Sequence, residues 1–161
     1  MINTDIRLKT AVDIAHMRRP SKVVETILNR VKSIIVPGVT TITIDRFCAE
    51  LMKKNKVTSA LLGYKGYPFH ICTSVNNVAA HGFPNEYELN EGDIIKIDIS
   101  VLSNGWYSDS AWTFSVGKPF QDQIRLIKAT WQAMVRGIAH ARPGKNIGDI
   151  GDAVEKTAKQ Y

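Results

Sequence analysis

The stretch from Glu91 to Gly117 predicts two antiparallel strands joined by a tight turn. In its first part, apolar residues occupy every second position, at Ile95, Ile97, Ile99 and Val101. The dipeptide Asn104-Gly105 tolerates the positive φ angles of a type I′ turn, which makes it a strong hairpin signal. The stretch therefore predicts a hairpin with one apolar face and one polar face.

The two-residue turn also fixes which residues face each other across the hairpin. The expected cross-strand pairs are Ser103–Trp106, Ser100–Asp109 and Asp98–Ala111. Asp98 and Asp109 then share one face as diagonal neighbours, roughly 7 Å apart. Two unpaired carboxylates at this spacing repel each other, and a divalent metal, or two ions about 3.5–4 Å apart, removes the conflict. The open alternative is two solvated aspartates on the wet face of a hairpin.

Length and composition indicate one globular domain. The chain has 161 residues, of which 44% are hydrophobic and 22% charged. No apolar run reaches the roughly 18–20 residues of a membrane helix, and the first residues lack the apolar core of a signal peptide. We therefore expect a cytoplasmic protein without a membrane partner. Cys48 and Cys72 follow no disulfide or zinc pattern, so both are expected to be reduced.

The charge balance is basic, with a net charge of +6 and a pI near 9.4. Such a charge suits a polyanion such as a ribosome surface. The basic residues are scattered, however, and no nucleic-acid-binding motif accompanies them. A solvated basic surface is the first interpretation, and a polyanionic neighbour is the second.

Two helices are expected before the hairpin. Residues 10–35 carry apolar positions with a helical period, interrupted by Pro20. Either a short helix ends near Arg18 and a new one begins near Ser21, or a single helix kinks at Pro20. Pro37-Gly38 stops the pattern, and Thr40 or Thr41 then caps a second helix that runs to about Lys54.

Residues 57–83 predict short strands and irregular turns. Gly63, Gly66 and Pro68 permit close backbone turns, and this segment is either a surface loop or part of a binding pocket. His81 precedes a Gly-x-Pro sequence, where a strand breaks into a turn. A histidine at this place is either a structural residue or one that reaches a ligand.

The pattern restarts after the hairpin. A helix is expected from Pro119 to about His140–Arg142, followed by Pro143-Gly144 and a last helix towards Tyr161. This order repeats the helix, Pro-Gly and helix of the first part. We therefore interpret residues 1–118 as a first half-repeat and residues 119–161 as the beginning of a second. A complete protein of this kind is expected to have a second hairpin beyond residue 161.

Three separated motifs occur in order: residues 63–68, residues 74–84 and residues 92–98, with Asp109 following eleven residues after Asp98. Together they resemble the bacterial kind of type I methionine aminopeptidase, from about residue 8 to Tyr161. The resemblance implies an α+β fold called pita-bread, a pseudo-symmetric sandwich of two related halves. This chain would supply the first half and the start of the second.

The resemblance also implies roles for particular residues. Asp98 and Asp109 match two ligands of a dinuclear metal centre, and His81 matches a histidine that hydrogen-bonds the substrate near the scissile amide. The pocket for the methionine side chain corresponds to Tyr64, Tyr67 and Cys72. A nearby monovalent-cation site corresponds to Asn76 and Val78.

The implied function is metal-dependent hydrolysis that removes the initiator methionine from peptides and nascent proteins, with the ribosome as a further partner. The implied cofactor is a pair of Co, Mn, Fe or Zn ions, and oxygen ligands favour the first three over a thiolate zinc site. An activated water would attack the first peptide carbonyl while a carboxylate moves the proton.

This chain departs from the family pattern at several points. The family's remaining ligands, one histidine and two glutamates, belong to the second half, and Lys65 and Leu61 stand where relatives often carry histidine and cysteine. We therefore expect weak or no activity from these residues alone, and self-association through an open sheet. The alternative function is a non-catalytic pita-bread binding module. A proline-specific relative, such as aminopeptidase P or prolidase, is disfavoured by the motif at residues 63–68.

Overall fold

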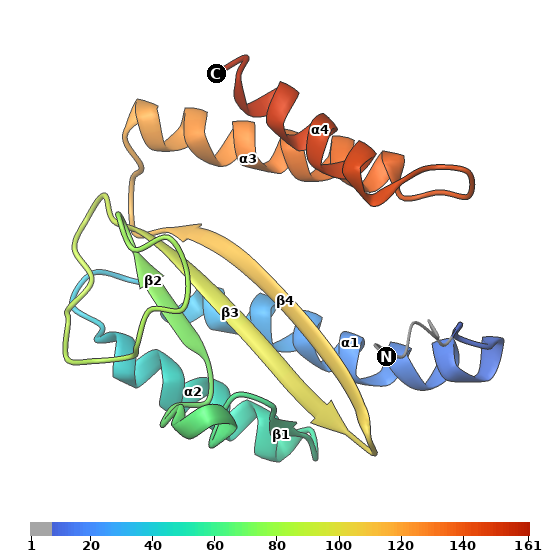
Figure 1. Ribbon diagram of the computed structural model, residues 1–161. Helices are drawn as coiled ribbons and strands as arrows, with labels where there is room; N and C mark the ends of the chain where they lie inside the picture. The colour runs from blue at the N-terminus through green and yellow to red at the C-terminus, as the bar shows by residue number, and fades with distance from the viewer. Residues whose placement is uncertain (1–7) are drawn as a thin grey trace. The chain divides into compact units, whose positions relative to one another are not determined.

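The computed structural model describes residues 8–161, which form two compact units that divide between Gly117 and Lys118. Unit 1 contains two long helices and a sheet, and unit 2 contains two helices (Figure 1). The interpretation of these parts as half-repeats stays a prediction. Across residues 8–161, no helix has both the length and the apolar character that crossing a membrane requires.

Helix α1 (Ala11–Val31) is a single helix that continues through Pro20, which resolves the two alternatives left open by the sequence. Thr10 begins it with a capping box, in which the Thr10 side chain accepts from the Asp13 backbone N–H and the Asp13 carboxylate accepts from the Thr10 N–H. Its buried face is apolar in the second half of the helix, at Val24, Ile27 and Val31. A short 3₁₀ turn, η1 (Lys32–Ile34), follows.

Helix α2 (Thr41–Lys54) begins after Thr40, whose hydroxyl accepts from the Thr43 backbone N–H at 3.3 Å. The cap thus falls on one of the two predicted threonines. Ile44, Cys48 and Leu51 form the buried stripe of this helix. Burial, together with the nearby charge of Asp45, raises the pKa of the Cys48 thiol to about 12, so this cysteine is a packing residue.

Strand β3 (Ile94–Ser103) is the centre of the sheet. Strand β4 (Trp106–Ser115) pairs with it along its whole length. The other edge of β3 is shared by β2 (Cys72–Val75) and the two-residue β1 (Thr58–Ser59), because β2 pairs with one part of β3 and β1 with another. All of these pairings are antiparallel. A second 3₁₀ turn, η2 (Tyr64–Gly66), lies between β1 and β2.

The observed register of the β3–β4 hairpin confirms the predicted one. Asn104 and Gly105 form the loop with φ angles of 51° and 81°. The pairs Ser103–Trp106, Ser100–Asp109 and Asp98–Ala111 all occur. No bulge shifts the register between the turn and Asp98, so Asp98 and Asp109 share one face of the sheet.

The two faces of β3 differ as the alternation predicts. The isoleucine face, defined by Ile95, Ile97, Ile99 and Val101, is fully buried. It belongs to the core that also contains Ile27 of α1 and Ile44 of α2. Helix α1 contacts β3 and β4. The opposite face, called here the carboxylate face and carrying Lys96, Asp98 and Ser100, is only half-buried.

Unit 2 is a pair of contacting helices, α3 (Gln121–His140) and α4 (Ile147–Ala158). The predicted start at Pro119 is wrong by two residues because Phe120 is extended and acts as the N-cap, with its N–H donating to the Gln123 side chain at 2.9 Å. In α3 the buried positions are small residues, Ala129, Ala133 and Gly137. A Cβ atom on Gly137 would lie 3.0 Å from Val154 of α4, so the glycine permits the close contact.

Candidate functional site

Asp98 and Asp109 form a pair of interacting carboxyl groups on the carboxylate face. Burial raises the pKa of Asp98, the negative charge of Asp109 raises it further, and His81 partly opposes the shift. A hydrogen bond between the two carboxyl groups acts in the same direction as the burial. Asp109 is exposed and accepts a hydrogen bond of 2.6 Å from the Ser100 hydroxyl, which lies directly across the hairpin. The pair is an oxygen-rich place that favours a positive charge.

His81 reaches this pair from a loop beside β2. It is exposed and has a φ of 56°, in the left-handed region, which few residues other than glycine adopt. The next residue, Gly82, accepts from the Thr73 N–H at 2.9 Å and donates its own N–H to the Ser74 hydroxyl at 3.0 Å. A Cβ atom at Gly82 would lie 2.2 Å from the Thr73 carbonyl oxygen. Only glycine therefore lets the chain approach β2 closely enough to place His81 there.

Tyr67 and Cys72 lie beside the same carboxyl group. Cys72 is the cross-strand partner of Asp98, and the two side chains share one face of the sheet. Burial raises the pKa of the Cys72 thiol, a hydrogen bond with Tyr67 lowers it, and the charges of Asp98 and Asp109 raise it again. The thiol is therefore a neutral wall of the site and not a nucleophile.

An aromatic cluster adjoins this wall. The ring of Tyr67 meets Phe83 edge to face with centroids 4.9 Å apart, and Phe69 packs against both rings at about 6 Å. The Tyr67 hydroxyl donates to the Ile71 carbonyl at 2.9 Å. Burial raises the pKa of Tyr67, so its hydroxyl stays protonated. An apolar surface thus lies next to the carboxylate pair.

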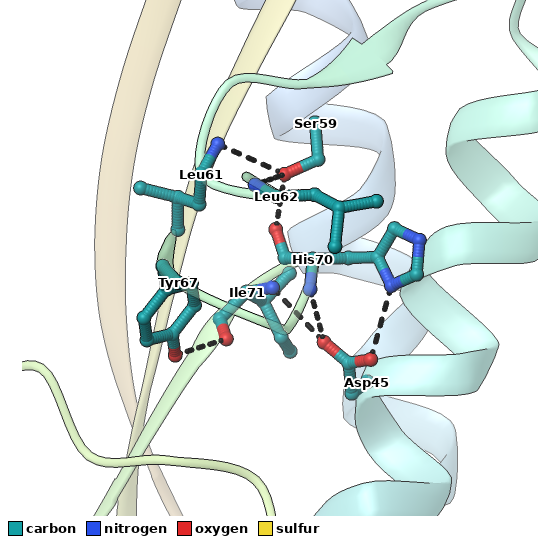
Figure 2. Close-up of polar contacts among 7 residues, drawn as sticks. All are labelled: Asp45, Ser59, Leu61, Leu62, Tyr67, His70 and Ile71. Atoms are coloured by element: carbon teal, nitrogen blue, oxygen red, sulfur yellow. Dashed lines mark hydrogen bonds and ion pairs between the residues drawn. The ribbon is translucent and has the colours of Figure 1, made fainter. Parts of the chain in front are cut away.

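The loop that carries Tyr67 is held by Asp45, a residue that sequence reasoning missed. Asp45 belongs to α2 and is 3% exposed. Its carboxylate accepts from the backbone N–H groups of His70 and Ile71 at 2.8 and 3.0 Å, and lies 3.1 Å from the His70 imidazole (Figure 2). A charged carboxylate that accepts two backbone donors is a strong anchor. The available signal was an aspartate directly beside Ile44 in the apolar stripe of the second helix.

Ser59 closes the same loop from its other end. Its hydroxyl donates to the His70 carbonyl at 2.7 Å and accepts from the N–H groups of Leu61 and Leu62 at 3.0 and 3.1 Å (Figure 2). Residues 59–71 are therefore fixed at both ends, one end on β1 and the other on α2. Tyr67 itself belongs to no helix or strand, so its position follows from these anchors.

Tyr64 lies outside this group. Its side chain is 61% exposed, and the Lys65 ammonium lies 5.5 Å from the centre of its ring. The structure places Asp98, Asp109 and His81 near Tyr67 and Cys72, whereas their roles in binding metal and substrate stay predictions. The role of Tyr64 in a methionine pocket stays a prediction.

Asn76 and Val78, the predicted cation ligands, lie in the turn after β2. Asn76 has a φ of 49°, and the Val78 N–H donates to the Val75 carbonyl at 3.0 Å. The Asn76 carbonyl already accepts a hydrogen bond from the Lys96 ammonium at 3.3 Å. A positive side chain at this oxygen does not fit a monovalent cation bound to the same oxygen.

The carboxylate pair fits a divalent metal in chemistry, because two mutually repelling oxygen ligands gain from a shared cation. In the described part of the chain, however, no three histidine, cysteine, aspartate or glutamate side chains come together as a metal-binding group. The role of Asp98 and Asp109 as metal ligands stays a prediction.

The sequence and the structure were compared with known proteins. The chain matches metallopeptidase family M24 over residues 15–161. It is 37% identical over 156 residues to a methionine aminopeptidase of Rickettsia prowazekii. The matched residues make up 97% of this chain and 60% of that relative. A methionine aminopeptidase of Clostridium perfringens is 38% identical over 151 residues, covering 94% and 61%. The chain thus spans about three fifths of the length of these relatives.

Solved structures give the same picture of the fold. The crystal structure of methionine aminopeptidase from Rickettsia prowazekii matches with a TM-score of 0.95 at 37% identity, over 97% of this chain and 63% of the other. Prolidase from Pyrococcus furiosus matches with a TM-score of 0.83 at 20% identity, over 96% and 44%, which supports the fold alone. These matches confirm the expected α+β pita-bread fold class.

Proposed function

The chain belongs to metallopeptidase family M24, and we propose that it takes part in the metal-dependent removal of methionine from the N-terminus of peptides and nascent proteins. The observation that carries the proposal is the arrangement on one sheet face. Two facing carboxyl groups, Asp98 and Asp109, lie beside His81 and beside the apolar surface of Tyr67. The names of the relatives, methionine aminopeptidases, support the same activity.

Each residue has a chemical task in this proposal. Asp98 and Asp109 would hold divalent metal, which when bound supplies an activated water and polarises the first peptide carbonyl. His81 would donate a hydrogen bond to the substrate near the scissile amide. Tyr67 and Cys72, both kept neutral by burial, would bound the pocket for an uncharged methionine side chain, with Tyr64 at its rim.

The ligand set points to hard or borderline metals. Two carboxylates favour Mn²⁺, Fe²⁺ or Co²⁺, and a Zn²⁺ site rich in thiolate is disfavoured because Cys72 keeps its proton. Two ligands also hold metal weakly. We therefore propose that residues 8–161 need further ligands for efficient hydrolysis, supplied by additional chain or by a second copy.

The test is release of methionine from a Met-Ala peptide by the purified 161-residue chain with Mn²⁺, Fe²⁺ or Co²⁺. Asp98→Asn is the matched control, because it keeps the size of the side chain and removes the charge. Weak release that disappears in Asp98→Asn is the expected result. Release that is unchanged in Asp98→Asn would contradict the assignment of the site.

A second candidate function is a non-catalytic module that binds methionyl peptides. It is favoured by the lack of a group of three metal-ligating side chains among the described residues. Calorimetric titration of Met-Ala into the chain with a metal chelator present separates the two functions. Binding without any release in the presence of metal supports the module, whereas metal-dependent release supports the enzyme.

A further inference from the structure

The peptide of Asn76 is fixed at the end of β2 by three hydrogen bonds. Its N–H donates to the Ile94 carbonyl at 2.9 Å, and its side-chain oxygen accepts from the Ile94 N–H at 3.1 Å. Its side-chain N–H₂ group donates to the Asp93 carboxylate at 2.8 Å. Because the amide and the side chain are both committed, the direction of the Asn76 carbonyl is fixed as well.

The Lys96 side chain donates a hydrogen bond to the Asn76 carbonyl oxygen. It lies on the carboxylate face of β3, where it pairs with Ser74 of β2, and its ammonium donates to the Asn76 carbonyl at 3.3 Å. None of the ion pairs found among residues 8–161 involves Lys96. Alkali cations are also bound by backbone carbonyl oxygens. The half-buried Lys96 ammonium therefore carries its positive charge at the kind of oxygen that would bind such a cation.

We propose that the Lys96 ammonium takes the place of a monovalent cation at the turn formed by residues 76–78. Lys96 then links this turn to the central strand β3, and no bound K⁺ or Na⁺ is needed for the link. The turn leads on to His81. The inference disagrees with the cation site that family resemblance assigns to Asn76 and Val78. It does not depend on the proposed peptidase activity, because it concerns only how the turn is held.

The test compares thermal unfolding of the 161-residue chain in KCl, NaCl and tetramethylammonium chloride at equal ionic strength. Tetramethylammonium is too large to be coordinated by a pair of carbonyl groups. The unchanged chain should have the same unfolding midpoint in all three salts, because Lys96 supplies the charge. Lys96→Met keeps an unbranched side chain and removes the charge, so its midpoint should be higher by roughly 4 °C in KCl or NaCl than in tetramethylammonium chloride.

Lys53→Met is the matched control, since Lys53 is an exposed lysine at the end of α2. It should behave as the unchanged chain does. Lys96→Gln provides a second variant should Lys96→Met fail to fold. A midpoint of the unchanged chain that K⁺ or Na⁺ raises would overturn the proposal, as would Lys96 variants whose midpoint is the same in all three salts. The same new dependence in Lys53→Met would also overturn it, because the effect would then be one of net charge.

Discussion

Asp45 and Asp98 are two aspartates of unit 1 that the fold treats in opposite ways. Asp45 is buried, and its carboxylate accepts hydrogen bonds from two backbone N–H groups. The same carboxylate also contacts the His70 imidazole. Asp98 is half-buried and faces a second carboxyl group, Asp109. The first charge is satisfied by the protein itself. The charge of Asp98 is instead repelled by the charge of Asp109.

This difference fits a structural role for Asp45 and the metal-binding role that we propose for Asp98. A carboxylate that is fully hydrogen-bonded stabilises the fold, and its removal leaves buried donors without partners. A carboxylate that is repelled by another one costs stability until a cation arrives. The comparison therefore predicts opposite effects of the same Asp-to-Asn substitution at the two positions.

The largest effect is expected for Asp45→Asn. The asparagine oxygen can still accept from both backbone N–H groups, because these donate to one oxygen of Asp45. The substitution removes the negative charge that strengthens these bonds and turns an N–H₂ group toward the His70 imidazole, so the free energy of unfolding should fall by about 2–3 kcal/mol. Urea unfolding at neutral pH measures this loss. Glu50→Gln, at an exposed position of the same helix, should change stability by less than about 0.5 kcal/mol. If Asp45→Asn lowered the free energy of unfolding as little as Glu50→Gln does, the structural role assigned to Asp45 would be wrong.

Asp93 extends the comparison to a second satisfied carboxylate. Burial opposes its ionisation, but hydrogen bonds from Asn76, the Asn90 N–H and Tyr87 outweigh burial and lower the pKa of Asp93. A lowered pKa gives stability that is present above the unfolded value of about 3.9 and is lost as the pH falls through the folded value. Asp93→Asn should therefore cost about 1–2 kcal/mol at pH 7.

The pH dependence provides the control for this prediction. The difference in urea unfolding free energy between the unchanged chain and Asp93→Asn should shrink as the pH is lowered below about 3.9. Glu86→Gln, an exposed neighbour, should show no such difference. A constant difference between pH 7 and pH 3 would mean that the charge of Asp93 is not the stabilising feature.

The smallest effect, with the opposite sign, is expected for Asp98→Asn in metal-free buffer. The folded state raises the pKa of Asp98, so the ionised pair costs stability above the folded pKa and costs nothing below the unfolded value of about 3.9. The variant should gain on the order of 1 kcal/mol at pH 7, and the gain should vanish in acid. Urea unfolding with a chelator present measures it, and a loss of stability would show that Asp98 is structural, like Asp45.

The carboxylate pair was predictable because its geometry is local. Asn104-Gly105 fixes the turn, and the alternation of apolar residues fixes the face, so the register around Asp98 follows from neighbouring residues. The cap of α2 was narrowed to Thr40 or Thr41 for the same reason. The fold class followed from motifs in their order along the chain.

The Asp45 anchor was not predictable because it joins residues 25 and 26 positions apart in sequence. No periodicity relates a helix residue to the backbone N–H groups of a distant loop. Pro20 was ambiguous because proline removes one helical hydrogen bond, and only packing decides whether the helix continues. The partner of Lys96 was hidden for a similar reason, since a long side chain gives no sign of the carbonyl it reaches.

The most direct test of the account measures thermal unfolding of the chain with and without millimolar Mn²⁺. A cation that binds only the folded state raises its midpoint. The account predicts that Mn²⁺ raises the midpoint of the unchanged chain, and that Asp98→Asn and Asp109→Asn abolish the rise while Glu50→Gln retains it. A midpoint that Mn²⁺ leaves unchanged, or raises equally in the Asp98 and Asp109 variants, would contradict a metal-binding role for this pair.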